Sequence, residues 1–170
     1  MKNRKLLIGV VLVAAAAAWY AFRPERLFLN QTVNESLPVA AAAQPAGTTT
    51  VPSAPVPLAS GRFHDVLHKG AGVATIYQLP DGKRVLRLTE FETSNGPDLQ
   101  LYLVAAADSR DSDTVKKAGF VTLGALKGNQ GDQNYDVPAG TNLRTYRSVT
   151  VWCRRFSANF ATAPLAVEKN

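Results

Sequence analysis

The alternation of hydrophobic and polar positions divides the chain into three parts. Residues 6–22 are 17 consecutive apolar or small residues. As a helix with a rise of about 1.5 Å per residue, this run spans roughly 25 Å, slightly less than the hydrocarbon core of a bilayer. Residues 24–60 have no apolar period, and residues 61–170 alternate as strands do. The pattern therefore predicts an N-terminal transmembrane helix (1–23), a stalk (24–60) and a β domain (61–170).

The flanks of the apolar run favour an uncleaved signal anchor. Three basic residues lie among the first five residues and are expected to keep that end in the cytoplasm. Trp19 and Tyr20 lie near the far end of the run, where amphipathic rings prefer the membrane interface. The small residues Ala14–Ala18 leave a cleaved signal peptide as the alternative. Both interpretations predict a C-terminal domain outside the cytoplasm, and the anchor predicts a single-pass protein of the cell membrane.

The stretch that leads into the β domain is rich in alanine, proline, threonine and serine. It has no apolar period and cannot bury a core. Pro52, Pro55 and Pro57 favour extended polyproline geometry. We expect a semi-rigid stalk that holds the domain away from the bilayer.

The first part of the β domain reads as a hairpin. Gly72–Leu79 and Lys83–Thr93 alternate, and Pro80-Asp81-Gly82 between them has the chemistry of a tight turn. Phe91 is out of phase with the apolar positions before it. A β-bulge near Glu90 would bring it back to the buried face.

The remainder of the domain predicts further short strands separated by turn residues, with one or two helical turns at 109–119. Seven to nine short strands indicate an all-β fold, either a β-sandwich or a closed antiparallel barrel. The further strands are expected at 99–105, 121–126, 134–137, 148–156 and 163–167.

Composition and charge exclude several classes of function. A chain of 170 residues has room for one ordinary domain plus tails. The single cysteine excludes an internal disulfide, and two histidines exclude a three-histidine zinc site. The net charge is +6, but residues 1–26 hold five basic residues against one acidic residue, which is +4 of that total. The domain itself has a mixed surface, so we expect no nucleic-acid partner.

Cys153 is the chemically distinctive group of the β domain. At the period of a strand it shares a face with Val149 and Val151, while Trp152 and Arg154 point the other way. If the valine face is the core face, Cys153 is a small buried hydrophobe with an inert thiol. The alternative is a redox-active thiol or a ligand to haem or a metal.

Two histidines offer a second candidate site. His64 and His68 are four residues apart and would share a face of a helix, but the segment ends at Gly70 and is too short for a stable one. We therefore expect histidines that are exposed or hydrogen-bonded. With Cys153 they nominally supply a blue-copper ligand set, but no histidine follows the cysteine and the only methionine is Met1, which disfavours copper.

Acidic residues give no enzymatic constellation. Asp108, Asp111 and Asp113 form a cluster without the glycine and distal glutamate of an EF-hand loop, so we expect helix caps or a solvated loop. No carboxylate pair or catalytic triad can be recognised. We therefore expect a protein that is not an enzyme.

Three motifs of the β domain occur together. They are Phe91 followed by Asn95-Gly96-Pro97-Asp98-Leu99, the LKGN-x-G-x-Q-x-Y run from Leu126 to Tyr135, and Trp152-Cys153 with Phe156 and Phe160 after it. With them, the chain over 61–167 resembles the DM-thirteen domain, which is described as an electron-transfer domain and is often found beside DOMON domains.

The resemblance implies a compact, sandwich-like and usually extracytoplasmic domain. It implies a redox role for Cys153, as a free thiol or as a ligand to a group such as haem, and His68 matches the histidine that precedes the family's glycine pair. We therefore expect a membrane-anchored redox, haem-binding or metal-binding module with a redox or envelope protein as partner. The alternative is a non-catalytic module for cell-surface adhesion or envelope interaction.

Overall fold

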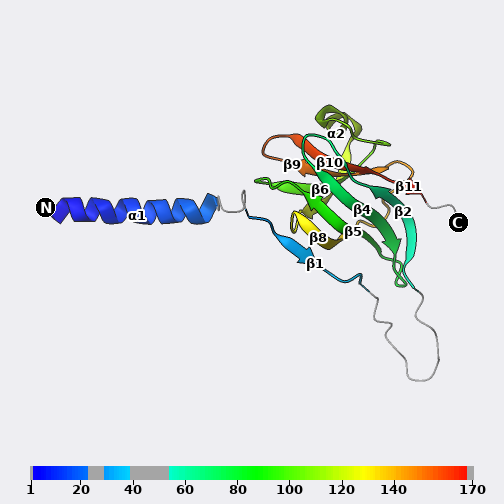
Figure 1. Cartoon of the computed structure of the whole chain (residues 1–170), viewed down its shortest axis with the longest axis horizontal. Coiled ribbons are helices and arrows are strands. Elements are labelled where there is room, and N and C mark those ends of the chain that lie inside the picture. Colours follow the sequence, from blue (N-terminus) through cyan, green and yellow to red (C-terminus); the bar gives the residue numbers. More distant parts are fainter. Residues whose placement is uncertain (1, 23–28, 39–53, 168–170) are drawn as a thin grey trace, which may run out of the picture.

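The computed structural model describes residues 2–22, 29–38 and 54–167 (Figure 1). Residues 24–28 and 39–53 of the predicted Ala/Pro/Thr-rich stalk lie outside the described residues. In chain order the elements are α1 (Lys2–Phe22), β1 (Thr32–Asn34), β2 (Val56–Arg62), β3 (His64–Asp65), β4 (Gly70–Gln78), β5 (Arg84–Thr93), β6 (Leu99–Val104), α2 (Ser112–Ala118), β7 (Phe120–Ala125), β8 (Gln130–Val137), β9 (Ser148–Cys153), β10 (Ala158–Pro164) and β11 (Ala166–Val167).

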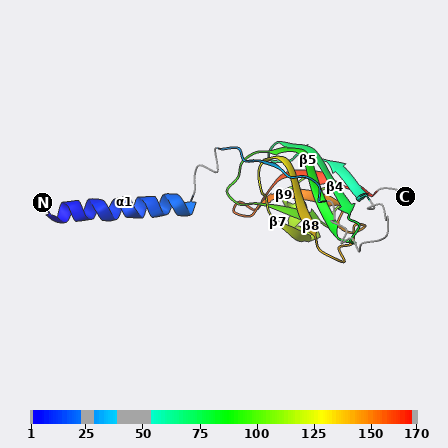
Figure 2. The same cartoon turned by 90° about the horizontal axis from the view of Figure 1, so that it is seen from below.

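The β domain is a sandwich of two separate sheets (Figures 1 and 2). One sheet has the strand order β1-β8-β5-β4-β2-β11, and the other has the order β3-β10-β9-β6-β7. A barrel requires a sheet whose hydrogen bonds close into a ring, whereas both of these sheets end in edge strands. Of the two expected architectures, the sandwich is confirmed and the closed barrel is wrong. The described residues form eleven strands, more than the seven to nine expected, and β1, β3 and β11 have only two or three residues each, too few to show alternation in the sequence.

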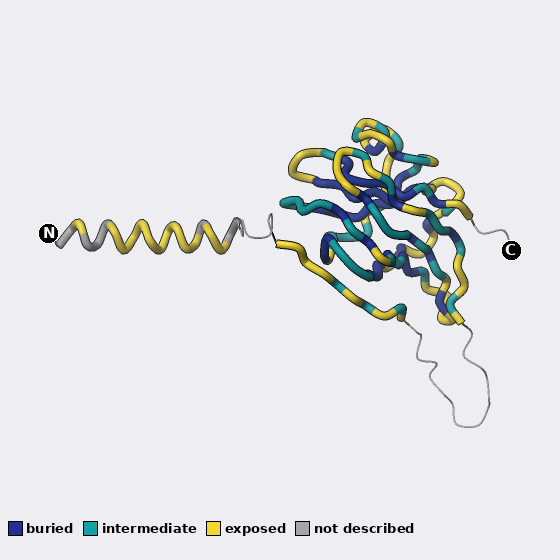
Figure 3. The backbone as a smooth tube through the Cα atoms, viewed as in Figure 1, coloured by how far each residue is buried: buried dark blue, intermediate teal, exposed yellow. Residues whose placement is uncertain are grey.

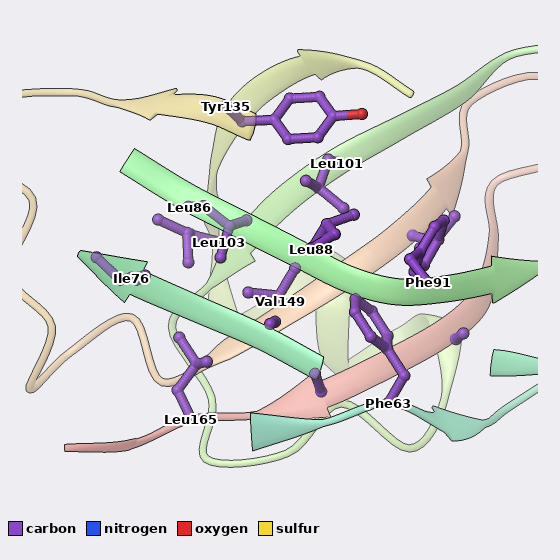
Figure 4. Close-up of a cluster of buried hydrophobic side chains, with 14 of the residues drawn as sticks. Phe63, Ile76, Leu86, Leu88, Phe91, Leu101, Leu103, Tyr135, Val149 and Leu165 are labelled. Carbon is purple, nitrogen blue, oxygen red and sulfur yellow. The ribbon is translucent and has the colours of Figure 1, made fainter. Parts of the chain in front are cut away.

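The main core lies between the two sheets. Figure 4 shows Ile76 and Leu88 from the first sheet meeting Leu103 and Val149 from the second. All four side chains are completely buried. The alternation of the sequence places them there, because every second residue of a strand points to the same face.

A second, smaller core lies on the outer face of the second sheet. Tyr102 and Trp152 point away from the sandwich interior and pack with Val115 of α2. As a result all six residues of β6 and all six residues of β9 are buried. Alternation predicted one buried face for these strands, and the cover that α2 provides makes them buried on both.

The predicted hairpin is confirmed. Its strands are β4 and β5, joined through the turn at 80–83. The predicted bulge is present as well: the pairing of β5 with β8 shifts register between Leu88 and Phe91, and Glu90 has a φ of 50°. The shift returns Phe91 to the core, where its ring lies 5.1 Å from that of Phe63 in an edge-to-face arrangement.

Two pieces of the predicted stalk are strands of the sandwich. β1 pairs in parallel with β8, from Thr32 opposite Gln130 to Asn34 opposite Asp132. β2 begins at Val56 and pairs with β4. The chain pairs with the domain at β1, before it enters the Pro-rich segment. Only a short stretch of sequence therefore separates α1 from its first contact with the domain.

The predicted N-terminal helix is present as α1, over Lys2–Phe22. Among the residues that the structure describes, no helix has both the length and the hydropathy that crossing a membrane requires. The helix itself is thus confirmed, and its role as a membrane anchor stays a prediction.

Candidate functional site

Cys153 lies at the end of β9, between β6 and β10. Its backbone partners are Leu99 on one side and Ala158 on the other. The residue has no exposed surface, and its side chain belongs to the main core, on the same face as Val149 and Val151. The alternation of the sequence predicted this placement. A thiol enclosed by apolar side chains and close-packed strands reacts with dissolved reagents only when the strands separate.

His68 lies at the surface, in the loop between β3 and β4. Its ring is stacked at a tilt on the ring of Phe160, with 3.8 Å between the centroids. Its backbone N–H donates to the carbonyl oxygen of Phe160 at 3.0 Å. Phe160 is a buried member of the same core as Cys153. The structure thus brings His68 to the outside of the core and Cys153 to its inside, and no hydrogen bond joins the two side chains.

The donor groups do not fit a haem or copper site on Cys153 and His68. Among the described residues, no three side chains of His, Cys, Asp or Glu come close enough together to hold a metal ion. The cysteine sulfur faces hydrocarbon, and the imidazole of His68 faces solvent against a phenylalanine ring. A shallow surface hollow of about 590 Å³ does exist, but its walls come from the residues just after β1 and from β5, β7 and β8, and include neither residue.

His64 is hydrogen-bonded to a carboxylate of the domain. It lies in β3, and its Nε2 is 2.8 Å from Oδ1 of Asp108. The other carboxylate oxygen of Asp108 accepts from Nε of Arg110 at 2.7 Å. The pair therefore ties β3 to the loop before α2, and the expectation of a hydrogen-bonded histidine is confirmed.

The acidic cluster behaves as the sequence predicted. Asp111 is the N-cap of α2, where its carboxylate accepts from the backbone N–H of Thr114 at 2.6 Å. Asp113 in the first turn of the helix is 3.6 Å from Nζ of Lys116. These contacts fix the helix that covers the outer face of β9.

The turn at 95–98 is held against the residue that follows Cys153. Arg154 donates from its backbone N–H to the carbonyl oxygen of Asp98 at 3.0 Å, and from Nε to the Asp98 carboxylate at 2.9 Å. The Arg154 hydrogen bond lowers the pKa of Asp98, and a further bond from Gln100 acts in the same direction. Two of the three motifs therefore meet at one end of the second sheet.

The remaining motif, from Leu126 to Tyr135, forms a buried polar network that sequence reasoning did not identify. Gln133 has no exposed surface; it donates to the carbonyl oxygen of Gly128 at 2.9 Å and accepts from the Tyr135 hydroxyl at 2.7 Å. The same hydroxyl accepts from the backbone N–H of Lys127 at 2.9 Å, and burial raises the pKa of Tyr135. The signal in the sequence was a glutamine and a tyrosine in phase with buried strand positions.

Comparison with known proteins gives one match. No curated protein and no solved structure matches the chain. The family model described as "Electron transfer DM13" matches residues 62–165, which is more than half of the 170 residues. The match begins at the last residue of β2, ends between β10 and β11, and includes all three motifs. The chain therefore belongs to the DM13 electron-transfer domain family, as its motifs predicted.

Proposed function

We propose that the DM13 domain of this chain has a redox-related, non-enzymatic role in electron transfer. The observation that carries the proposal is the family match over 62–165. Cys153 is the candidate group, because it is the only cysteine of the chain and lies within a motif of the family. The proposed partner is another redox protein. Because Cys153 is completely buried, electrons from that protein or from a dissolved mediator would reach the sulfur across the packed side chains and not by direct contact.

The test is an electrochemical titration of the full chain with dissolved mediators. We expect a redox response that is lost in Cys153→Ser and retained in Val151→Ala, a matched change two residues away on the same buried face of β9. Circular dichroism of each variant establishes that the domain is folded. A folded wild-type protein without any response contradicts the redox role.

The geometry argues that this role does not use haem or copper held by Cys153 and His68. Adding haem or Cu²⁺ to the full chain is expected to produce no absorption band that depends on these two residues. A charge-transfer band that disappears in Cys153→Ser would show that the strands open to form a ligand site, and it would revive the haem or metal hypothesis.

Attachment to a cell membrane is a further part of the proposal, with the DM13 domain outside the cytoplasm. It is supported by the 17-residue apolar run, its basic N-terminal flank and the aromatic pair Trp19 and Tyr20. Asn30 is hydrogen-bonded to the domain and lies eight residues after Phe22, the last residue of α1. A fully extended chain of eight residues reaches at most about 28 Å, which limits the distance between the helix and the domain. The full chain is expected to require detergent for extraction, and deletion of residues 1–26 is expected to release it. A freely soluble chain with an intact residue 1 contradicts the attachment.

Adhesion or envelope interaction is the second candidate function, and the burial of Cys153 favours it. A module of this kind needs a stable scaffold and exposed loops but no reactive sulfur. Capture of an envelope partner by the full chain, unchanged in Cys153→Ser, would support this candidate over the redox role. Loss of capture in a folded Cys153→Ser variant would contradict it.

A further inference from the structure

The segment 29–38, which contains β1 and is called the strap below, lies on the domain without contributing to its core. None of its residues is buried, and neither hydrophobic core includes any of them. The strap runs along the edge of the first sheet beside β8 and is mostly exposed (Figures 1 and 3). It also precedes the family match, which begins at residue 62. The strap thus adds no buried apolar side chain to the packed interior of the domain.

Side chains of the domain grip the first end of the strap. Asn129 accepts from the backbone N–H of Gln31 at 2.7 Å and donates from Nδ2 to the side-chain oxygen of Asn30 at 3.0 Å. Asn95 donates to the same Asn30 oxygen at 3.1 Å. Asn129 is itself largely buried, so it is a fixed part of the domain that recognises an amide side chain and the backbone beside it.

A second grip holds the other end through a carboxylate. Both oxygens of Glu35 accept from Nζ of Lys127, at 2.7 and 2.9 Å, and one of them also accepts from the backbone N–H of Asn134 at 2.7 Å. Nη1 of Arg87 donates to the Glu35 carbonyl oxygen at 2.9 Å. Nδ2 of Asn134 donates to the carbonyl oxygen of Ser36 at 2.7 Å. This end of the site therefore recognises an acidic side chain together with two backbone carbonyls.

Between the two grips, two glycines of the domain leave room for the backbone of the strap. Gly131 has a φ of 94°, and a Cβ atom there would clash with the backbone oxygen of Val33. A Cβ atom on Gly128 would clash in the same way with the backbone oxygen of Gln31. Glycine at both positions lets an extended backbone approach β8 closely. The strap uses this space to form a parallel pair with β8, as in recognition by strand addition.

From this arrangement we propose that the edge of β8 is a peptide-binding groove and that the strap is its bound ligand. The ligand is an extended peptide, parallel to β8, with an amide side chain at one position and a carboxylate five residues later. The chain fills the groove with its own Asn30 and Glu35. A partner peptide with the same spacing competes with the strap for this site. The residues that form the groove are Arg87, Asn95, Lys127, Gly128, Asn129, Gly131, Asp132 and Asn134.

Binding in the groove requires neither the redox role nor membrane attachment. All the groove contacts come from described residues of the domain and the strap, and Cys153 takes no part in them. Four residues of the Leu126–Tyr135 motif meet the strap. Lys127 and Asn129 make the hydrogen bonds at its two ends, and Gly128 and Gly131 leave room for its backbone between them.

The first experiment measures binding of a fluorescent peptide with the sequence of residues 29–38 to the full chain. In the double variant Asn30→Ala, Glu35→Ala the strap is weakened and the groove is expected to bind the peptide. Wild type is expected to bind it at least about tenfold more weakly, because a strap in the same chain competes at a high effective concentration. A peptide with alanine in place of Glu35 is expected to bind the double variant at least about tenfold more weakly than the parent peptide. Equal binding by wild type and the double variant, or no binding by a folded double variant, overturns the proposal.

The second experiment leaves the strap and the groove unchanged and decides the case if the double variant fails to fold. A protease site placed within 39–53 allows the purified full chain to be cut between the strap and β2. The two fragments are expected to elute together and to separate when free peptide 29–38 is added in excess. Fragments that stay together in excess peptide while the domain remains folded would show that the strap is a fixed strand, and the proposal would fail. A peptide with lysine in place of Glu35 is the control and is expected to leave the fragments together.

Discussion

The surroundings of Cys153 and the seam between β1 and β8 are opposite kinds of structure in one domain. Cys153 is enclosed by strands on both sides, by core residues on its own face of the sheet and by the layer under α2 on the other. The seam has no buried apolar residue from the strap and is held by amide, carboxylate and ammonium groups. Hydrophobic burial dominates the first region, and directional hydrogen bonds decide the second.

Rigidity and the proposed peptide binding lie in different parts of the domain. Separating a buried strand from its neighbours requires unfolding of the whole domain, whereas a polar seam at a sheet edge can open locally while the rest of the domain stays folded. The group proposed for electron transfer therefore lies in the most stable part of the domain. The proposed peptide groove lies where exchange costs least.

The largest expected effect comes from putting a charge in the sealed region. Cys153→Asp is expected to lower the free energy of unfolding by about 3–5 kcal/mol, since an acid at this position has no partner. Cys153→Ala, which removes only the sulfur, is expected to cost on the order of 1 kcal/mol. Urea unfolding of the full chain measures both. Thr122→Asp, at an exposed position of β7, is the control and is expected to stay within about 0.5 kcal/mol. A small effect of Cys153→Asp would mean that the sulfur is reachable by water.

Gln133→Ala tests whether the polar framework under the seam is as integral as the core. The change leaves the Tyr135 hydroxyl and both backbone groups of Gly128 without their buried partner. We expect a loss of about 2–4 kcal/mol in the free energy of unfolding. Gln78→Ala, at the exposed end of β4, is the matched control and is expected to change it by less than about 0.5 kcal/mol. Equal effects at the two positions would show that water replaces Gln133 at little cost.

The sealed region could be predicted from the sequence because its determinants are local. Alternation around Cys153 predicted that its side chain points to the core, and the out-of-phase Phe91 predicted the bulge at Glu90. The outer cover was missed, because a helix of seven residues shows its capping residues but not the sheet it lies on. The closed barrel could not be excluded either, since alternation is the same in a sandwich and in a barrel.

The seam could not be predicted, because its determinants lie far apart in the sequence. Asn30 and Glu35 find their partners 99 and 92 residues away. The strap shows no apolar period, which made it look like part of a stalk. Strand pairing that depends on polar side chains and on a glycine track leaves no pattern in hydropathy. The candidate site behaves in the same way: the family motifs could be recognised in the sequence, but the network that connects them required the structure.

Gly131→Ala separates the seam from ordinary backbone strain. Gly82→Ala is its matched control, because both glycines have positive φ, of 94° and 83°, but at Gly82 a Cβ atom meets nothing within 4 Å. We expect Gly82→Ala to cost about 1 kcal/mol and Gly131→Ala about 2 kcal/mol, since only the latter displaces the strap. Hydrogen exchange of the Glu35 amide, which donates to Asp132 at 2.9 Å, is expected to rise in Gly131→Ala alone. The same increase in both variants would locate the effect outside the seam.

The smallest expected effect is a dependence of the seam on pH. Burial alone would raise the pKa of Glu35, but hydrogen bonds from Lys127 and Asn134 and the charge of Lys127 outweigh it and lower the pKa below its ordinary 4.5. The contribution of the carboxylate is therefore complete above about pH 4.5 and is lost as the pH falls through the lowered value. Because the side chains of Glu35 and Lys127 are 34% and 41% exposed, we expect no more than about 1 kcal/mol.

The pH effect is best followed by NMR, through the amide resonances of β1 between pH 6 and pH 3. In wild type they are expected to shift as Glu35 is protonated, while the resonances of β9 around Cys153 stay constant. Glu35→Gln keeps the shape of the side chain and removes its charge, so its β1 resonances are expected to be nearly independent of pH over this range. Asp132, which is paired with Arg87 at 2.6 Å, lies on the same seam, and Asp132→Asn is the second control. If the wild-type shift persists in Glu35→Gln but vanishes in Asp132→Asn, the carboxylate that closes the groove is Asp132, and the assignment of the acidic grip to Glu35 is wrong.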